Sequence, residues 1–197
     1  MSQIVTGADG IEYVVEPKAD LSQADLRNLN LFQANLINAD FSESTLMNTN
    51  FRNSHLQGSN FNGTDLRNAY LMGAHMEGIK LNFAILSGMN LNGYDFTKAE
   101  LRYANFDFAH LQNAILNNSD MKGASLYQAD LSRTQLVGAD LSDSNMTEAI
   151  LSGANLHSAN LRYCNLSNTV LDNADLTNIK YNDETIWPEG FQSLGSQ

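Results

Sequence analysis

The sequence predicts a solenoid, a chain that winds steadily around one axis, and two observations support this prediction. Every fifth residue from Leu21 to Leu176 is Leu, Phe or Met, 32 times in succession. Of the residues two places before these centres, 18 of 32 are Ala and ten more are Ser, Thr or Cys. Neither a helix nor an ordinary strand repeats at five residues. One large and one small apolar residue in every five can both point inward only if the chain bends steadily around an axis.

The length of the chain predicts one domain or one rod of repeats. The 197 residues are 43% hydrophobic with a mean hydropathy of -0.30, which favours a soluble protein with a continuous core. No apolar run approaches the roughly 18 residues of a membrane-spanning helix. Residues 1–4 lack the basic and apolar regions of a signal peptide. Cys164 is the single cysteine and excludes an intrachain disulfide framework, so we expect a cytoplasmic protein.

The formal net charge of -11 bears on the possible partners. Phosphates attract basic surfaces, so the acidity argues against direct binding of a nucleic acid. The same acidity keeps rods soluble and apart from one another. It also leaves open the possibility that the surface imitates a nucleic acid.

The repeat unit is well defined at the residues around each centre. The residue before the centre is Asn or Asp in 19 of 32 cases, and typical copies are Ala24-Asp25-Leu26-Arg27-Asn28 and Ala154-Asn155-Leu156-His157-Ser158. Over residues 19 to 178 the chain resembles the pentapeptide-repeat family, whose motif is A(D/N)LXX. The segment 185–191 also looks like the tails of cyanobacterial members of that family.

The resemblance implies an all-β fold, a right-handed quadrilateral parallel β-helix in which four pentapeptides form one square coil. The eight coils expected here begin at residues 19, 39, 59, 79, 99, 119, 139 and 159. At a spacing of about 4.8 Å between parallel strands, the stack would be roughly 38 Å tall.

The open ends of such a stack need caps, because their unpaired backbone groups favour edge-to-edge association. We therefore divide the chain into an N-terminal cap segment (1–18), the β-helix (19–178) and a C-terminal cap or tail (179–197). In the first segment, residues 11–15 alternate in the manner of a strand. In the last, Tyr181, Ile186 and Phe191 keep the five-residue register, and Trp187-Pro188 is expected to lie across the final coil.

The coil 79–98 departs from the rule of small residues at Ile79, Met89 and Tyr94, and Leu29 is the one other large residue at such a position. The next coil has Ala at all four equivalent positions. Large residues beside small ones conserve volume between layers, so we expect a locally swollen but packed coil. The alternative is a hinge or a pocket at this coil.

Residues 20 apart are expected to share a face, which places His55, His75 and Asp95 in one column. Two imidazoles and a carboxylate are ligands that divalent metals accept. Side chains that point in parallel from a flat face converge poorly on one ion, however. We therefore interpret the column as a solvated ladder and expect no metal and no cofactor.

Aromatic and basic residues gather on the coils 79–98 and 99–118. Phe83 and Tyr103 share a column, Arg102 and Lys122 lie beside it, and Phe108 belongs to the next face. Exposed aromatic residues flanked by Arg are typical anchors of protein interfaces. These five are our candidate interface residues. The alternative is that the stacked rings stabilise the ladder, as cross-strand pairs do.

The sequence lacks catalytic motifs such as a phosphate-binding loop or a nucleophile elbow, so we expect a protein that is not an enzyme. Cys164 occupies a small position and is expected to be buried. The predicted function is a scaffold that binds another protein, without direct contact with nucleic acids or membranes. Its oligomeric state, monomer or dimer through ends or faces, stays open.

The family resemblance also implies an alternative function, because some pentapeptide-repeat proteins imitate duplex DNA and bind DNA gyrase. Such a surface needs long rows of one sign, whereas here acidic residues share a face with Lys80, Arg102, Lys122 and Arg162. The uninterrupted register leaves no room for the projecting loops of those relatives. The tail 192–197 is too short for their dimerising helix.

Overall fold

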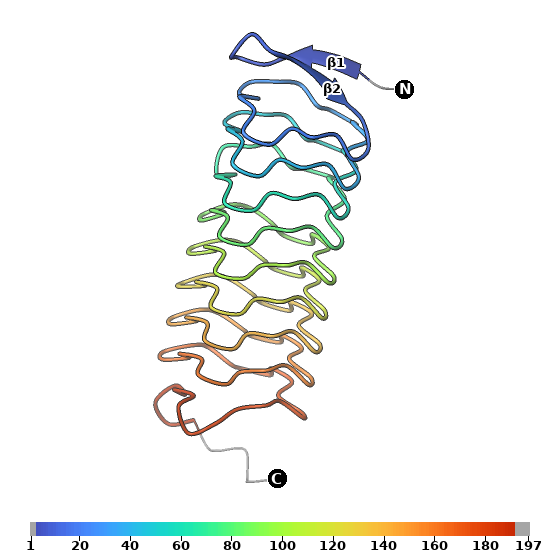
Figure 1. Ribbon diagram of the computed structural model, residues 1–197. Helices are drawn as coiled ribbons and strands as arrows, with labels where there is room; N and C mark the ends of the chain where they lie inside the picture. The colour runs from blue at the N-terminus through green and yellow to red at the C-terminus, as the bar shows by residue number, and fades with distance from the viewer. Residues whose placement is uncertain (1–2, 192–197) are drawn as a thin grey trace.

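The computed structural model describes residues 3–191, which form the predicted right-handed quadrilateral parallel β-helix. Parallel bridges join residues that are 20 apart, from Asp20 with Asp40 to Asn160 with Lys180. Figure 1 shows the stack of square coils that results, with the N-terminal hairpin at one end and the C-terminal segment at the other. Its four faces are named here by their pentapeptides in the first coil: face one 19–23, face two 24–28, face three 29–33 and face four 34–38.

The predicted centres fill the interior of the stack. Every centre from Leu21 to Leu166 is buried. Three phenylalanines form an aromatic layer, in which Phe41 stacks on Phe61 with 4.5 Å between ring centroids and Phe51 meets both rings edge-on. The last two centres of the register, Leu171 and Leu176, are only partly buried because no bridge joins their pentapeptides to a later one within the described residues. The inward assignment of the centres is therefore confirmed.

The corners of the coils explain the preference for Asn and Asp before each centre. At these positions the side-chain oxygen accepts a hydrogen bond from the backbone N–H two residues later, as between Asn50 and Arg52 at 3.1 Å. The corner residue, two places after the centre, has a positive φ throughout residues 23–178 except at Asn68. Asn and Gly tolerate this left-handed conformation best, which accounts for their frequency at corners.

The hydroxyl groups at the small positions are buried without loss of hydrogen bonds. Ser54 Oγ donates to the carbonyl of Phe51, in the preceding pentapeptide of the same coil, at 2.6 Å. Thr49 Oγ1 donates instead to Leu26 O, in the coil before, at 2.8 Å. Because a buried hydroxyl with a partner costs little, Ser and Thr can replace Ala here.

A β-hairpin covers the N-terminal end of the stack (Figure 1). Strand β1 (Gln3–Thr6) pairs antiparallel with β2 (Glu12–Val15), which lies within the predicted alternating stretch. Ala8 N donates to Asp25 O at 2.9 Å, so the hairpin turn is bonded to the first coil. This approach requires Gly7, where an added Cβ would lie 2.8 Å from the same oxygen.

At the C-terminal end the five-residue register slips by one after Tyr181, contrary to the prediction for Ile186. Ile186 forms a bridge with Asn165, 21 residues earlier, and 52% of its surface is exposed. Thr185 therefore takes the small position, where its hydroxyl donates to a backbone carbonyl. Trp187 moves into the centre position and packs against the core, in agreement with its predicted place across the final coil.

The coil 79–98 accommodates one of its three large residues as predicted. Ile79 is 1% exposed, and the backbone hydrogen bonds beside it remain, with Lys80 N donating to Ser59 O and Glu100 N to Ile79 O, both at 2.9 Å. A single large residue under a small one therefore fits into the stack.

For Met89 and Tyr94 the prediction of a packed coil is wrong. Both side chains are only partly buried, and the bridges expected between residues 70 and 90 and between residues 75 and 95 are missing. A third bridge, between residues 45 and 65, is also missing, on face two one coil earlier. The side chains of Met89 and Tyr94 follow one another around a corner, so their volume acts on two adjoining faces at once.

Candidate functional site

Phe83 and Tyr103 form an exposed aromatic pair at the corner between faces one and two. Their rings stack with 5.1 Å between centroids and an interplanar angle of 14°. The exposed fractions are 63% for Phe83 and 51% for Tyr103, so stacking shields the rings only in part. The pair presents a stacked aromatic surface near the middle of this edge.

Glycines lie at the same corner on either side of the pair. A Cβ at Gly123 would overlap the ring of Tyr103, whereas a Cβ at Gly63 would meet nothing within 4 Å. The Tyr103 ring therefore leans over the coil that follows. Gly123 supplies the room for it, and Gly63 leaves the other end of the pair open.

The backbone conformation at these positions opposes large side chains. Phe83 has a φ of 60° and Tyr103 a φ of 56°, in the left-handed region that bulky residues rarely occupy. This conformation costs roughly 1–2 kcal/mol for a residue with a Cβ. An aromatic residue that is both exposed and in this conformation contributes little to folding.

The basic residues beside the aromatic pair are held in ion pairs. Arg102 Nε lies 2.6 Å from Asp120 Oδ2, and Lys122 Nζ lies 3.3 Å from Asp143 Oδ2. Because the Asp120 carboxylate accepts this hydrogen bond, the pKa of Arg102 is raised. The pairs are exposed, so each adds at most about 1 kcal/mol to stability. They form a polar rim of both signs around the rings.

Phe108 lies one corner further on, between faces two and three. Its ring meets Tyr127 edge-on, with 5.5 Å between centroids, and 52% of its surface is exposed. Of the five residues that the sequence selected, the structure thus brings together Phe83 and Tyr103, with the two basic residues at their side. Phe108 forms a separate aromatic contact.

The histidine column on face four is a stack of rings. The imidazoles of His55 and His75 lie 4.9 Å apart and 5° from parallel. Asp95 does not continue this column at regular spacing, because the bridge between positions 75 and 95 is missing. Within residues 3–191 no three His, Cys, Asp or Glu side chains are arranged to hold a metal ion.

Cys164 is buried at a small position, as predicted. Its Sγ donates to Leu141 O at 2.8 Å and lies 3.4 Å from Ser144 Oγ. Burial raises the pKa of the thiol to about 11. The thiolate, which is the nucleophilic form, is therefore scarce at neutral pH.

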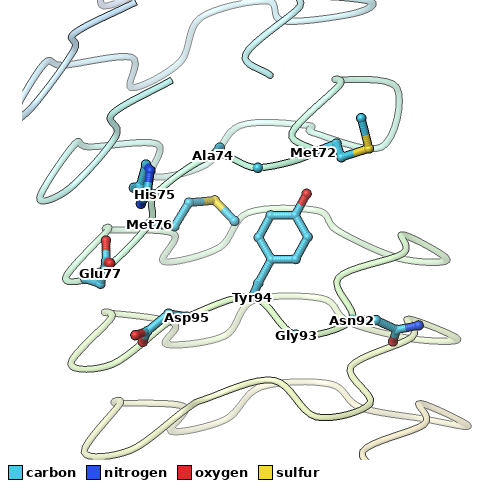
Figure 2. Close-up of a pocket in the computed structure, with 10 residues that line it drawn as sticks. Met72, Ala74, His75, Met76, Glu77, Asn92, Gly93, Tyr94 and Asp95 are labelled. Carbon is cyan, nitrogen blue, oxygen red and sulfur yellow. The ribbon is translucent and has the colours of Figure 1, made fainter. Parts of the chain in front are cut away.

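A second candidate site lies on faces three and four, where the coils part. A hinge or pocket at this coil was the alternative to the packed coil that the sequence predicts. We call the opening between residues 68–77 and residues 87–96 the slot. Figure 2 shows the ring of Tyr94 rising from its coil toward Met72 and Ala74 of the coil before. The Tyr94 hydroxyl has no hydrogen-bond partner among the residues that the structure describes, and burial raises its pKa. Two large residues at consecutive small positions, 89 and 94, were the available signal in the sequence.

Two cavities occupy the slot and share the residues Met72, Asn92 and Tyr94. The cavity on face four has a volume of about 360 Å³ and includes Glu77. The cavity on face three has a volume of about 580 Å³ and includes Arg52.

Comparison with known proteins agrees with this architecture. Residues 18–178 match the family described as pentapeptide repeats. The crystal structure of HetL, a pentapeptide repeat protein involved in heterocyst differentiation regulation from the cyanobacterium Nostoc sp. strain PCC 7120, is 30% identical over 83% of this chain and 75% of that one, with a TM-score of 0.53. A pentapeptide repeat protein from the thylakoid lumen of Arabidopsis thaliana is 30% identical over 49% of this chain and 68% of that one, with a TM-score of 0.48.

A more distant similarity is to QnrB1, a plasmid-mediated fluoroquinolone resistance protein, at 17% identity over 79% of this chain and 92% of that one, with a TM-score of 0.48. A search among curated proteins gave no match. Residues 3–191 contain no apolar helix of the length that a bilayer requires. The family match covers most of the chain, and this protein therefore belongs to the pentapeptide repeat family.

Proposed function

We propose that this protein is a non-catalytic scaffold that binds another protein through the aromatic pair, Phe83 and Tyr103. The observation that carries the proposal is that two exposed rings, both at corners with left-handed backbone, stack on one another. Large side chains at these corners oppose folding, and the rings gain little from burial. A partner that covers the rings would provide the burial that the isolated protein lacks.

The surroundings of the pair have the anatomy of a protein interface. Stacked aromatic rings form an apolar centre, and the ion pairs of Arg102 and Lys122 form a polar rim. Phe108, on the next corner, adds a separate aromatic contact at the other side of face two. We infer that Phe83 and Tyr103 supply most of the binding free energy and that the rim contributes orientation and selectivity. HetL, a relative, is involved in regulation, a role that a binding protein can fill without chemistry.

The test is affinity capture from the source lysate with mass spectrometry, using the wild-type protein and a Phe83→Ser, Tyr103→Ser variant. The matched control is Tyr163→Ser, because Tyr163 is a corner residue of the same column with a φ of 62° and 55% exposure. We expect the double variant to capture at least tenfold less of one particular protein than the wild type does. The Tyr163→Ser variant should capture that protein as the wild type does. Equal capture by all three proteins would contradict the proposal.

A loss of binding is informative only if the variants fold. Both changes replace exposed rings, so we expect the melting temperature to stay within a few degrees of the wild type. A collapse of the melting temperature in the double variant would instead mean that the ring stack stabilises the coils, the alternative that the sequence analysis left open.

A further inference from the structure

We propose that the slot between the coils 59–78 and 79–98 binds a short extended peptide segment, with its acidic residue ahead of its basic one. This site lies on faces three and four, away from the corner of the aromatic pair. It is therefore independent of the proposed function, and either proposal can fail alone.

Backbone groups without hydrogen-bond partners in the next coil line the slot on face three. In the coils above and below, the centre N–H donates to the next coil, and that coil's bridging N–H donates back. Between Leu71, Ala69 and Asn90 neither of these hydrogen bonds is formed. A donor on Leu71, an acceptor on Ala69 and both groups of Asn90 thus face the opening with the spacing of a parallel ladder. An extended peptide is the ligand that presents complementary groups at that spacing.

On face four the same groups of Met76, Ala74 and Asp95 are also unpaired. The ladder is intact at both ends of the slot, where Leu66 N donates to Ile85 O at 3.0 Å and Gly78 N to Thr97 O at 2.9 Å. The opening is therefore confined to two faces and held by paired coils on either side.

The walls of the slot are apolar in the middle. Met72 is 67% exposed and Tyr70 44% exposed, and Met89 and Tyr94 are partly buried beneath them. Methionine side chains adapt their shape to a bound apolar group, and tyrosine rings offer it large apolar faces. The side chains of a peptide that alternate toward this wall would therefore be apolar.

Two side chains of opposite charge, Arg52 and Glu77, lie at opposite ends of the slot. Arg52 lies over the ring of Tyr70, 4.6 Å from its centroid, and its Nε is buried without a hydrogen-bond partner among residues 3–191. Glu77 Oε2, on the face-four side, is likewise buried and unpartnered within that range. A buried polar atom without a partner is costly, and a ligand that satisfies it gains affinity.

These two atoms fix the direction of the peptide. Both coils run from the side of Arg52 toward the side of Glu77, and a parallel peptide runs the same way. Its acidic residue would then meet Arg52 before its basic residue meets Glu77. The bend between faces three and four, at the corner residues Gly73 and Gly93, favours Gly or Asn between the two charges.

The test begins with hydrogen exchange of the wild-type protein alone. The amides of Leu71, Met76, Asn90 and Asp95 should exchange at least tenfold faster than those of Leu111 and the other paired positions of the coils. Equal protection would mean that the ladder is closed in solution and would overturn the proposal.

The binding test uses random nine-residue peptides displayed on phage and selected on the wild-type protein. The comparison variant is Met89→Ala, Tyr94→Ala, which restores the usual small residues and should close the slot. We expect selected peptides with an acidic residue ahead of a basic one, which bind the closed variant at least tenfold more weakly. Methylation of alternate backbone nitrogens in a selected peptide should reduce binding by a similar factor.

Several outcomes would overturn the proposal. These are no enrichment of peptides, equal binding to the closed variant, or unchanged binding after backbone methylation, the last of which would point to a side-chain pocket. Arg52→Gln should relax the preference for the acidic residue, and Arg133→Gln, at an exposed corner of face three, is its control. Loss of peptide binding in Phe83→Ser, Tyr103→Ser would instead place the peptides on the aromatic pair.

Discussion

Replacement of Met89 and Tyr94 by Ala should leave the protein at least as stable as the wild type, although two partly buried side chains are removed. Closure of the slot would restore five backbone hydrogen bonds, three on face three and two on face four. At about 0.5–1.5 kcal/mol each, they stabilise the fold by roughly 2.5–7.5 kcal/mol. The side chains are only partly buried, so their removal costs about 2–3 kcal/mol in transfer free energy. The expected net effect lies between about zero and 5.5 kcal/mol of stabilisation.

Ile79→Ala provides the contrast, because Ile79 is a large residue at a small position of the same coil. Its side chain is fully packed under an intact ladder, so its truncation leaves a cavity and costs about 2–5 kcal/mol. Urea unfolding, monitored by circular dichroism, gives the transition midpoints of the wild type, the double variant and Ile79→Ala. Differences between midpoints report stability if the slope of the unfolding free energy against urea concentration is the same for all three. If Met89→Ala, Tyr94→Ala destabilised the protein as much as Ile79→Ala does, the two side chains would be ordinary core residues and our account of the slot would be refuted.

Four further predictions concern the core, the histidine column, the surface charge and the buried thiol. Leu111→Ala should cost about 2–5 kcal/mol and Gln112→Ala less than about 0.5 kcal/mol in urea unfolding, and similar losses would contradict the inward assignment. Calorimetry should detect no submicromolar zinc binding that depends on His55 and His75. Micromolar protein should not inhibit supercoiling by DNA gyrase, and potent inhibition would favour the alternative of a DNA mimic. Because the pKa of Cys164 is raised to about 11, its burial should stabilise the protein fully below pH 9 and progressively less toward pH 11; Cys164→Ser should remove that pH dependence of unfolding.

The fold could be predicted from the sequence because one short pattern repeats without exception. A five-residue register that places a large and a small apolar residue together admits few backbone paths. Four pentapeptides make one coil, so residues that form a bridge, such as Asp20 and Asp40, are 20 apart in the sequence. The prediction of register became wrong only after Lys180, where the pattern decays and one additional residue moves Trp187 into the centre position.

The slot could not be predicted from the repeat pattern in this way, because it depends on the combination of Met89 and Tyr94. Ile79 shows that one large side chain at a small position is absorbed by the small residues above and below it. Met89 and Tyr94 occupy successive faces. The packed side chains around them cannot make room for both, so the backbones of the two coils separate instead. A rule that treats each position separately gives the same answer for all three residues and misses this coupling.

The aromatic pair could be predicted from the sequence only in part. The sequence placed Phe83 and Tyr103 at adjacent levels of one column, and the structure stacks their rings there. The role of Gly123 was not evident from the sequence, because it depends on the direction in which the Tyr103 ring leans. Likewise, the ion pair of Arg102 with Asp120 depends on side-chain conformation rather than on spacing.

The most direct test of the central claim, that the aromatic pair is a protein-binding surface, is photo-crosslinking in the source cells. A photoreactive phenylalanine, p-benzoylphenylalanine, would replace Phe83, Tyr103 or, as the control at the same type of corner, Tyr163. We predict that positions 83 and 103 crosslink to the same protein and that position 163 does not. Crosslinks that are absent at both positions, or equal at position 163, would contradict the account.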